Sequence, residues 1–193
     1  RVIMKDNHIF SHKIMRIKYS GYDTRRDEDL VHVETDNCNF FILDPAFGSN
    51  SADSQHPYCY RRILGIFHAN FDLIPLLGYP LPISANGDSL RELTVEFLWV
   101  RWYKFHPATT PYELDTTSFL PISSNDSLGF ICLINIIRAC HLIPRFTLAQ
   151  SGNGTASLAN DKCEWNAYFV NKFVDCEMFM RYLWGDAIGH TYS

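Results

Sequence analysis

Apolar and polar side chains alternate along several stretches of the chain, and a period of two residues indicates β-strands. The alternation is strongest over residues 93–105 (LTVEFLWVRWYKF), where large rings fall on both faces of the expected strand. A strand with this pattern is typical of the centre of a sheet, because both of its faces must be covered. Three further stretches also indicate strands, namely residues 13–19, 38–43 and 58–71, with a bulge or bend expected at Gly65.

The remaining segments are read as connections, one ambiguous stretch and a terminal helix. Residues 47–57, 75–88 and 151–160 predict loops, and residues 106–127 predict an irregular connection. Residues 128–143 are apolar and fit either a short helix or a strand, while residues 165–174 alternate like a strand. Asp175 is a good N-cap for a helix over residues 176–184 that Gly185 would close. Its expected docking stripe is Phe179, Tyr182 and Leu183.

Together these elements predict a single mainly β (α+β) domain over residues 1–193. We expect five to seven strands in a curled or SH3-like, partly open barrel with long loops and one or two short helices. The C-terminal helix is expected near residues 176–184. An aromatic content of 15% agrees with this prediction, because large rings favour strands and fill a core of this kind.

Charge and cysteine content narrow the classes of function. The net charge of −4 disfavours bulk binding of nucleic acid, which usually needs a basic excess. The chain contains no apolar run long enough for a membrane span and no signal-peptide pattern at its start. None of the six cysteines has CxxC spacing, so we expect no structural zinc and read the thiols as reduced.

Five blocks of the sequence, in order, resemble a known region of fungal proteins. They are YSGYDTRRDEDLVH (19–32), HPYCYRRILGIFHANF (56–71), VEFLWVRWY (95–103), CHLIPRF (140–146) and YFVNKFVDCEMFMRYLWGDAIGH (168–190). This series is similar to a C-terminal region of large transposon-encoded proteins of mushroom-forming fungi, of the Plavaka and Kyakuja-Dileera-Zisupton type. The resemblance implies a mobile-element origin, a nuclear setting and a place in the C-terminal part of a larger protein, and the start at Arg1 fits that expectation.

A second resemblance is architectural. The order of residues 60–67 (YRRILGIF), a loop and residues 96–103 (EFLWVRWY) is similar to the core strands of bromo-adjacent-homology modules. Those modules are β-rich and interact with chromatin. The likeness is one of fold, and it therefore adds little about function.

An aromatic and basic set on the two strongest strands supplies the candidate binding site. An aromatic recess can hold a methylated lysine by cation–π attraction, although packing in the core is the favoured role for most of these rings. Trp99, Arg101 and Tyr103 share one face of their strand, whereas Trp102 lies on the other. The candidate residues are Tyr58, Tyr60, Arg61, Arg62, Trp99, Arg101, Trp102 and Tyr103.

Two alternative functions use the charged residues. A basic face that binds nucleic acid would combine the three arginines of the candidate site with Arg16, Lys18, Arg25, Arg26 and Lys104. A metal-dependent hydrolase would use the acidic cluster of Asp23, Asp27, Glu28 and Asp29, although pairing with Arg25 and Arg26 is the favoured reading of that cluster.

The histidines and cysteines give no stronger candidate. His56, His68, His106, His141 and His190 lack the spacing of a metal motif, and we expect them to be structural. Cys132 and Cys140 have apolar neighbours in the sequence, which is typical of inert core thiols. The sequence thus favours a binding module over an enzyme. We expect no cofactor, no membrane contact, and a partner that is a protein, chromatin or the rest of the parent chain.

Overall fold

The protein is mainly β and ends in a single α-helix. The computed structural model describes residues 1–20, 26–45, 47, 56–75, 82, 92–110, 113–148 and 164–184. These residues form strands β1 (Val2–His12), β2 (Ile14–Ser20), β3 (Arg26–His32), β4 (Asn39–Leu43), β5 (Tyr58–Leu73), β6 (Glu92–His106), β7 (Thr116–Phe119), β8 (Leu128–Cys132), β9 (Ile136–Ala139), β10 (Leu142–Pro144) and β11 (Tyr168–Val170). The short 3-10 helix η1 (Leu133–Asn135) follows β8, and α1 spans Cys176–Trp184.

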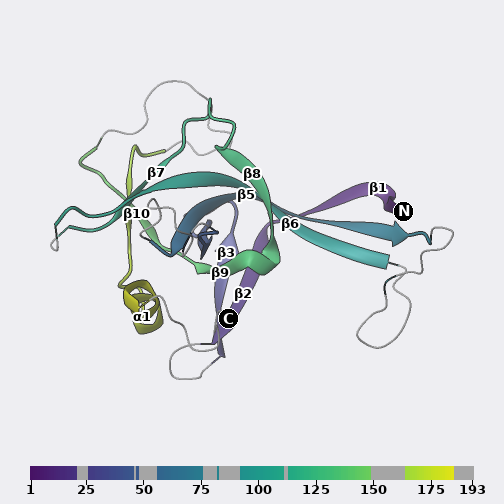
Figure 1. The fold of residues 1–193 in the computed structure, drawn as a ribbon, viewed down its shortest axis with the longest axis horizontal. Coiled ribbons are helices and arrows are strands. Elements are labelled where there is room, and N and C mark those ends of the chain that lie inside the picture. The colour runs from purple at the N-terminus through teal and green to yellow at the C-terminus, as the bar shows by residue number, and fades with distance from the viewer. Residues whose placement is uncertain are drawn as a thin grey trace.

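One curled sheet contains most of the strands. Its order is β10-β11-β7-β6-β5-β4-β9, with β1 pairing along β5 and β8 pairing along β6. The sheet forms a partly open barrel, and β1 together with the far ends of β5 and β6 extends from the body as a long arm (Figure 1). Strands β2 and β3 form a separate hairpin that contacts β9. The predicted fold class is therefore confirmed.

The long strands β5 and β6 run through both the body and the arm. They pair antiparallel from Arg61 opposite Trp102 to Asp72 opposite Glu92, with one register shift between Ile63 and Gly65. A Cβ on Gly65 would lie 2.4 Å from Cε2 of Phe67, so the ring of Phe67 covers this glycine. The bulge expected at Gly65 is confirmed. β6 is also a central strand, as predicted, since β5 flanks one edge and β7 and β8 flank the other.

The two faces of the body are covered by two separate cores. The tyrosine core fills the inside of the curl and contains Tyr58, Tyr60, Tyr103 and Tyr168 with several aliphatic neighbours. The aliphatic core lies on the opposite face, where Met15, Ile17 and Val31 of the β2–β3 hairpin pack on the sheet. Burial of both faces explains why strand 93–105 carries large rings at odd and even positions alike.

The structure corrects several secondary-structure predictions. It has more than the five to seven strands expected, because β1, β3 and β7 form in segments that were not predicted as strands. Residues 106–127 contain β7 rather than only an irregular connection, and the ambiguous stretch 128–143 resolves into β8, η1, β9 and the start of β10. The strand expected over 165–174 is limited to β11. These short strands form because neighbouring strands satisfy their backbone groups, which periodicity alone does not reveal.

The predicted helix is present, but it docks through another face. The backbone N–H of Met178 donates to Oδ1 of Asp175 at 2.6 Å, so the expected N-cap is confirmed. The buried side chains are Met178 and Arg181, whereas Leu183 is exposed. The buried face of the helix is therefore displaced by about one residue from the predicted stripe. Gly185, which was expected to close the helix, lies outside the described residues. No helix in the described part of the chain is long and apolar enough to cross a membrane.

Candidate interaction surface

The register of β5 and β6 separates the eight candidate residues onto two faces of the sheet. Arg61 lies opposite Trp102, and the next pair along, Arg62 opposite Arg101, faces the other way. The tyrosines of the set are all buried in the tyrosine core, on the same side as Arg62 and Arg101. The predicted split between Trp102 and its neighbours Arg101 and Tyr103 is confirmed by this register.

Arg61 and Trp102 form a stacked pair on the side of the aliphatic core. The guanidinium carbon of Arg61 lies 3.3 Å from the centroid of the Trp102 ring. Arg61 also donates to the carbonyl oxygen of Tyr60 at 2.7 Å, while its Nε has no hydrogen-bond partner within the described residues. Burial lowers the pKa of Arg61 to about 10, so the side chain is still charged at neutral pH. A desolvated cation–π pair of this kind contributes about 2 kcal/mol.

Arg101 has an equally enclosed position on the other side. Its guanidinium carbon lies 3.9 Å from the ring centroid of Phe119, and its Nη1 donates to Oε1 of Glu164 in an ion pair. The opposite face of Phe119 stacks on Tyr103 at 4.3 Å between ring centroids. The Tyr103 hydroxyl in turn donates to Asn39 at 2.9 Å. The side chains of Arg101 and Glu164 are 6% and 11% exposed, so this pair belongs to the interior.

These contacts give the candidate set a structural role. Tyr58, Tyr60, Arg61, Arg62, Arg101 and Tyr103 are buried, and only Trp99 and Trp102 are half-buried. The buried tyrosines and arginines are already occupied by rings and hydrogen-bond partners inside the fold, as the favoured core-packing interpretation implies. A cage for a methylated lysine would need several rings open to solvent around one recess.

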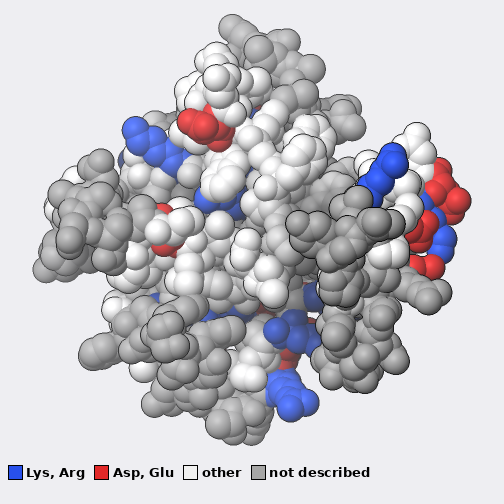
Figure 2. Space-filling model, turned by 45° about the vertical axis from the view of Figure 1, so that its right-hand side comes forward, with Lys and Arg blue, Asp and Glu red and all other residues white. Residues whose placement is uncertain are grey.

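The basic residues of the set do not assemble on one surface. Arg61, Arg62 and Arg101 are buried, whereas Arg16 and Lys18 of β2 and Arg26 of β3 are exposed on the β2–β3 hairpin and Lys104 is exposed on β6. Arg16 also pairs with Glu28 at 3.3 Å, and Arg25 lies outside the described residues. In Figure 2 the Lys and Arg side chains occur in separate places on the visible face. Contacts to a phosphate backbone need several exposed cations side by side.

The acidic candidates lie on a strand and are engaged by an arginine from β9. Asp27 and Asp29 belong to β3, and Asp23 lies outside the described residues. Asp29 accepts two hydrogen bonds from Arg138, at 3.1 Å from Nε and 3.0 Å from Nη2, and a third from the backbone N–H of Ala139 at 3.0 Å. Its carboxylate is therefore neutralised within the fold. The described residues contain no group of three His, Cys, Asp or Glu side chains placed to hold a metal ion.

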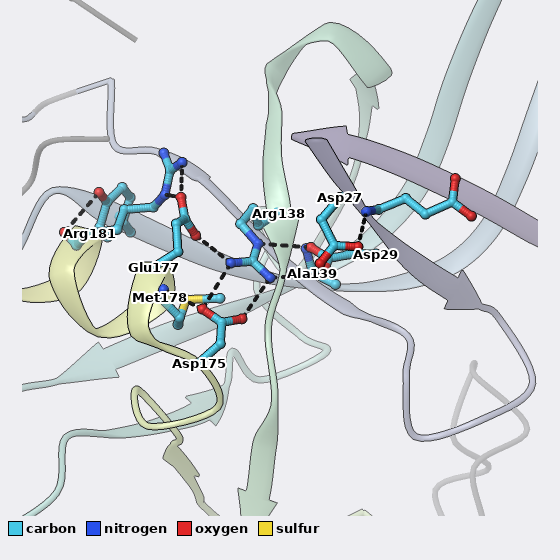
Figure 3. A network of polar contacts seen from close by, with 10 residues as sticks. Asp27, Asp29, Arg138, Ala139, Asp175, Glu177, Met178 and Arg181 are labelled. Atoms are coloured by element: carbon cyan, nitrogen blue, oxygen red, sulfur yellow. Dashed lines mark hydrogen bonds and ion pairs between the residues drawn. The ribbon is translucent and has the colours of Figure 1, made fainter. Parts of the chain in front are cut away.

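Arg138 is the centre of a larger ion-pair network, drawn in Figure 3. Besides Asp29 of β3, it donates to Asp175 at 3.2 and 3.0 Å and to Glu177 at the start of α1. Burial lowers the pKa of Arg138, but the hydrogen bonds that Arg138 donates to Asp29 and Asp175 outweigh this effect, so the pKa is raised. The side chain is 3% exposed. One buried cation thus ties the β2–β3 hairpin and the helix to the sheet, a contact that single-segment patterns could not reveal.

Most of the histidines have structural partners, as expected. His56 stacks on Phe105 at 4.0 Å between centroids and shares a 2.8 Å hydrogen bond with the hydroxyl of Tyr60. Burial lowers the pKa of His56 to about 4, so it is neutral at pH 7. The other described histidines of the predicted set hydrogen-bond within the fold, His68 to His12, His106 to Ser118 and His141 to Asn171. His190 lies outside the described residues.

The cysteines divide between core and surface. Cys140 is buried and burial raises its pKa well above the usual thiol value, as expected for an inert core residue. Cys132, by contrast, is exposed at the end of β8, so the prediction that it lies in an apolar core is wrong. Cys59, Cys132, Cys140 and Cys176 are free thiols, and Cys163 lies outside the described residues.

A surface that was not predicted lies where β5, β6 and β8 run out of the body. The rings of Phe67 and Phe97 stack at 5.6 Å, and Phe97 meets Phe130 edge to face at 5.9 Å. Phe130 is 69% exposed, and it lies opposite Trp99 in the β6–β8 register. We call these four aromatic residues, together with the exposed Cys132 opposite Phe97, the outer aromatic strip. The sequence does contain a sign of this surface, because residues 97, 99, 128, 130 and 132 are apolar at every second position of two strands.

Comparison with known proteins gives no relative. No family model, curated protein or solved structure matches the chain. Function must therefore be argued from the residues and the geometry above.

Proposed function

We propose that the protein is a non-catalytic interaction module of a transposon-derived fungal protein, and that it binds a protein or chromatin partner in the nucleus. The observation that supports this proposal most is the outer aromatic strip, an exposed apolar surface on the regular part of the sheet. Exposed clusters of large rings cost free energy in water and typically mark sites of interaction. Aromatic side chains also dominate the energetics of protein–protein interfaces.

The buried position of the charged candidates favours this function over the alternatives. The three arginines of the candidate site serve stacking and ion pairing inside the body, which removes them from a nucleic-acid surface. Asp29 is likewise held by Arg138, so a hydrolase would have to break a buried ion-pair network before it could bind a metal. Partner binding by the strip requires neither change, because Phe130 is exposed and the other three rings are half-buried in the folded state.

Site-specific photocrosslinking tests the proposal. A benzophenone amino acid replaces Phe130 in the full parent protein, and the same replacement is made at Leu30 as a control. Leu30 is 52% exposed on β3, far from the strip along the sequence. We expect irradiation in nuclei to join position 130 to protein, with a discrete product that position 30 does not give. Absence of any product specific to position 130 would contradict the proposal.

A second measurement distinguishes the nucleic-acid alternative from the proposed function. Binding of a mixed-sequence DNA duplex is followed between about 50 and 200 mM salt, over which phosphate contacts lose several orders of magnitude in affinity. We expect weak binding that has no dependence on Phe130. Tight binding with a steep salt dependence, lost on substitution of the exposed Arg16, Lys18 and Lys104, would favour the nucleic-acid alternative instead.

A further inference from the structure

Within the part of the chain that the structure describes, the outer edge of β8 has unpaired backbone groups that point away from the sheet. The N–H of Trp102 donates to the carbonyl oxygen of Ser127 at 3.0 Å, which fixes the phase of the β6–β8 ladder. Because antiparallel strands alternate between bonded and non-bonded pairs, the bonded pairs are Val100 with Gly129 and Leu98 with Ile131. The N–H and C=O groups that point outward therefore belong to Leu128, Phe130 and Cys132.

This edge lacks the features that usually keep strand edges apart. β1 carries Lys5 and Asp6 and is irregular where Asp6 and Asn7 adopt φ values of 55° and 50°. β10 ends at Pro144, and β2 and β3 carry exposed charges. β8 (LGFIC) is the described edge strand without charge or proline, and its central side chain is 69% exposed. Natural sheets blunt their edges with charges, prolines or bulges, so an unprotected apolar edge indicates a pairing site.

We propose that this edge pairs antiparallel with the same edge of a second copy of the chain. The inference rests on the proposed function and names the partner at that surface. The outward groups are centred on Phe130, so a two-fold axis through this residue places Phe130 against its counterpart and Leu128 against Cys132 of the second copy. An uncharged edge brings no like charges together when it meets itself. The result is an isologous interface in which every outward backbone group has a partner.

Pairing at this edge also covers the outer aromatic strip. Phe130 and Cys132 project to the side of the sheet that carries Trp99 and Phe97, because residues opposite one another share a face. A two-fold axis at Phe130 therefore joins the strips of both copies into one surface. The two Phe130 rings are neighbours across the new ladder, and cross-strand aromatic pairs stabilise sheets. Main-chain hydrogen bonds supply the association, and the alternate apolar side chains supply its register.

The first experiment measures the mass of the whole chain in solution. Sedimentation equilibrium over a range of concentrations is expected to show a monomer–dimer equilibrium. Phe130→Lys places two ammonium groups at the two-fold axis and is expected to raise the dimer Kd by about tenfold or more. Leu30→Lys, which adds the same charge at another exposed apolar position, is expected to leave Kd unchanged. Circular dichroism confirms that each variant is folded.

The second experiment tests pairing of the backbone itself. Cys132 has φ −77° and ψ 142°, a conformation that proline adopts, and its N–H points away from β6. Cys132→Pro therefore deletes one outward donor without breaking the β6–β8 ladder, whereas Cys132→Ser retains that donor. We expect Cys132→Pro to raise the dimer Kd by about tenfold, and we expect Cys132→Ser to leave it near the wild-type value.

Each other outcome overturns the inference in a distinct way. A chain that remains monomeric excludes the second copy, and a dimer that survives both Phe130→Lys and Cys132→Pro uses another surface. Loss of the dimer with Phe130→Lys but not with Cys132→Pro indicates side-chain contact without strand pairing. If the chain is monomeric while position 130 crosslinks to a different protein, this inference fails and the proposed function stands.

Discussion

The two halves of the β5–β6 ribbon follow the same alternating pattern and have opposite surroundings. In the body, from Tyr58 to Ile63, residues of β5 are mostly buried between the two cores. In the arm, the same ribbon carries Phe67 and Phe97 on one side and His68 and Glu96 on the other, with β1 along β5 and the end of β8 along β6. Covering elements, rather than the ribbon's own sequence, decide which half becomes interior and which becomes a surface.

This difference assigns the two halves separate tasks. Cations of the body are held by rings and carboxylates from β3, β6, β7 and α1, so changes there should act on stability. Rings of the arm contact one another and solvent, so changes there should act on association. The predictions below test this division, beginning with the largest expected effect.

Removal of Arg138 should have the largest effect on stability. Arg138→Ala leaves Asp29 and Asp175 without their cation and leaves Glu177 paired with Arg181 alone. Breaking a buried ion pair from one side costs about 3–5 kcal/mol. Urea denaturation at pH 7 measures the loss in free energy of unfolding. Arg16→Ala is the matched control, since the Arg16–Glu28 pair is exposed and should contribute less than about 1 kcal/mol. Equal effects of the two variants would refute the assigned role of Arg138.

Acid should weaken the body through His56. Its pKa is lowered from 6.5 to about 4 by burial, so the unfolded state takes up the proton first as the pH falls. The stabilising contribution is complete above pH 6.5 and is lost as the pH falls toward 4. The shift corresponds to about 3 kcal/mol in total, most of it lost by pH 4.5.

The comparison variant for this prediction is His56→Phe, which keeps a ring against Phe105 but cannot titrate. The pH dependence of its free energy of unfolding between pH 7 and 4.5 should be shallower than that of the wild type by about 2 kcal/mol. Nearby charges are Asp44, Asp115 and Lys172, and all of them are retained in both proteins. Identical pH profiles would mean that His56 is not held neutral by burial.

A smaller effect is expected where the cation–π pair of Arg61 meets β8. A Cβ on Gly129 would lie 2.9 Å from Nε1 of Trp102, so Gly129→Ala displaces the indole and disturbs its stacking on Arg61. We expect a loss of about 1–2 kcal/mol, the usual range for overpacking, together with a change in tryptophan fluorescence. Ser127→Ala, just before β8, is the comparison that adds no volume and removes only the hydrogen bond from the Ser127 hydroxyl to the carbonyl oxygen of Ile122, so it should leave the indole environment unchanged. A stability loss without any change in the indole environment would contradict this explanation.

A structural feature could be predicted from the sequence when it depends on residues within a single segment. The central position of β6, the bulge at Gly65 and the Asp175 cap follow from alternation, a glycine and a capping residue within single segments. Strand β3 could not be predicted, because its acidic sequence forms a strand only when β2 pairs with it and Arg138 binds Asp29. Membership of the transposon-type family and the likeness to bromo-adjacent-homology modules remain predictions.

The candidate site also shows that local sequence patterns do not reveal contacts between distant segments. The aromatic and basic residues of β6 were correctly placed on two faces, yet the burial of Arg101 depends on Phe119 and Glu164, which are distant in the sequence. The outer aromatic strip was missed because the alternation of 97–99 and 128–132 looks the same whether the face is covered or open. Only the tertiary arrangement shows that Phe130 keeps an edge contact with Phe97 and is otherwise left 69% exposed.

Removal of the Phe130 ring should have the smallest effect on stability. It should have the largest effect on the properties of the surface. Phe130→Ser removes a ring that is 69% exposed, so the free energy of unfolding of the monomer should change by less than about 0.5 kcal/mol. The same change should lower fluorescence of a dye that binds exposed apolar surface, because it deletes the most exposed ring of the strip. Measuring both quantities on one preparation below the dimer Kd separates folding from association. A large loss of stability with unchanged dye binding would place Phe130 in the core and reverse the contrast between body and arm.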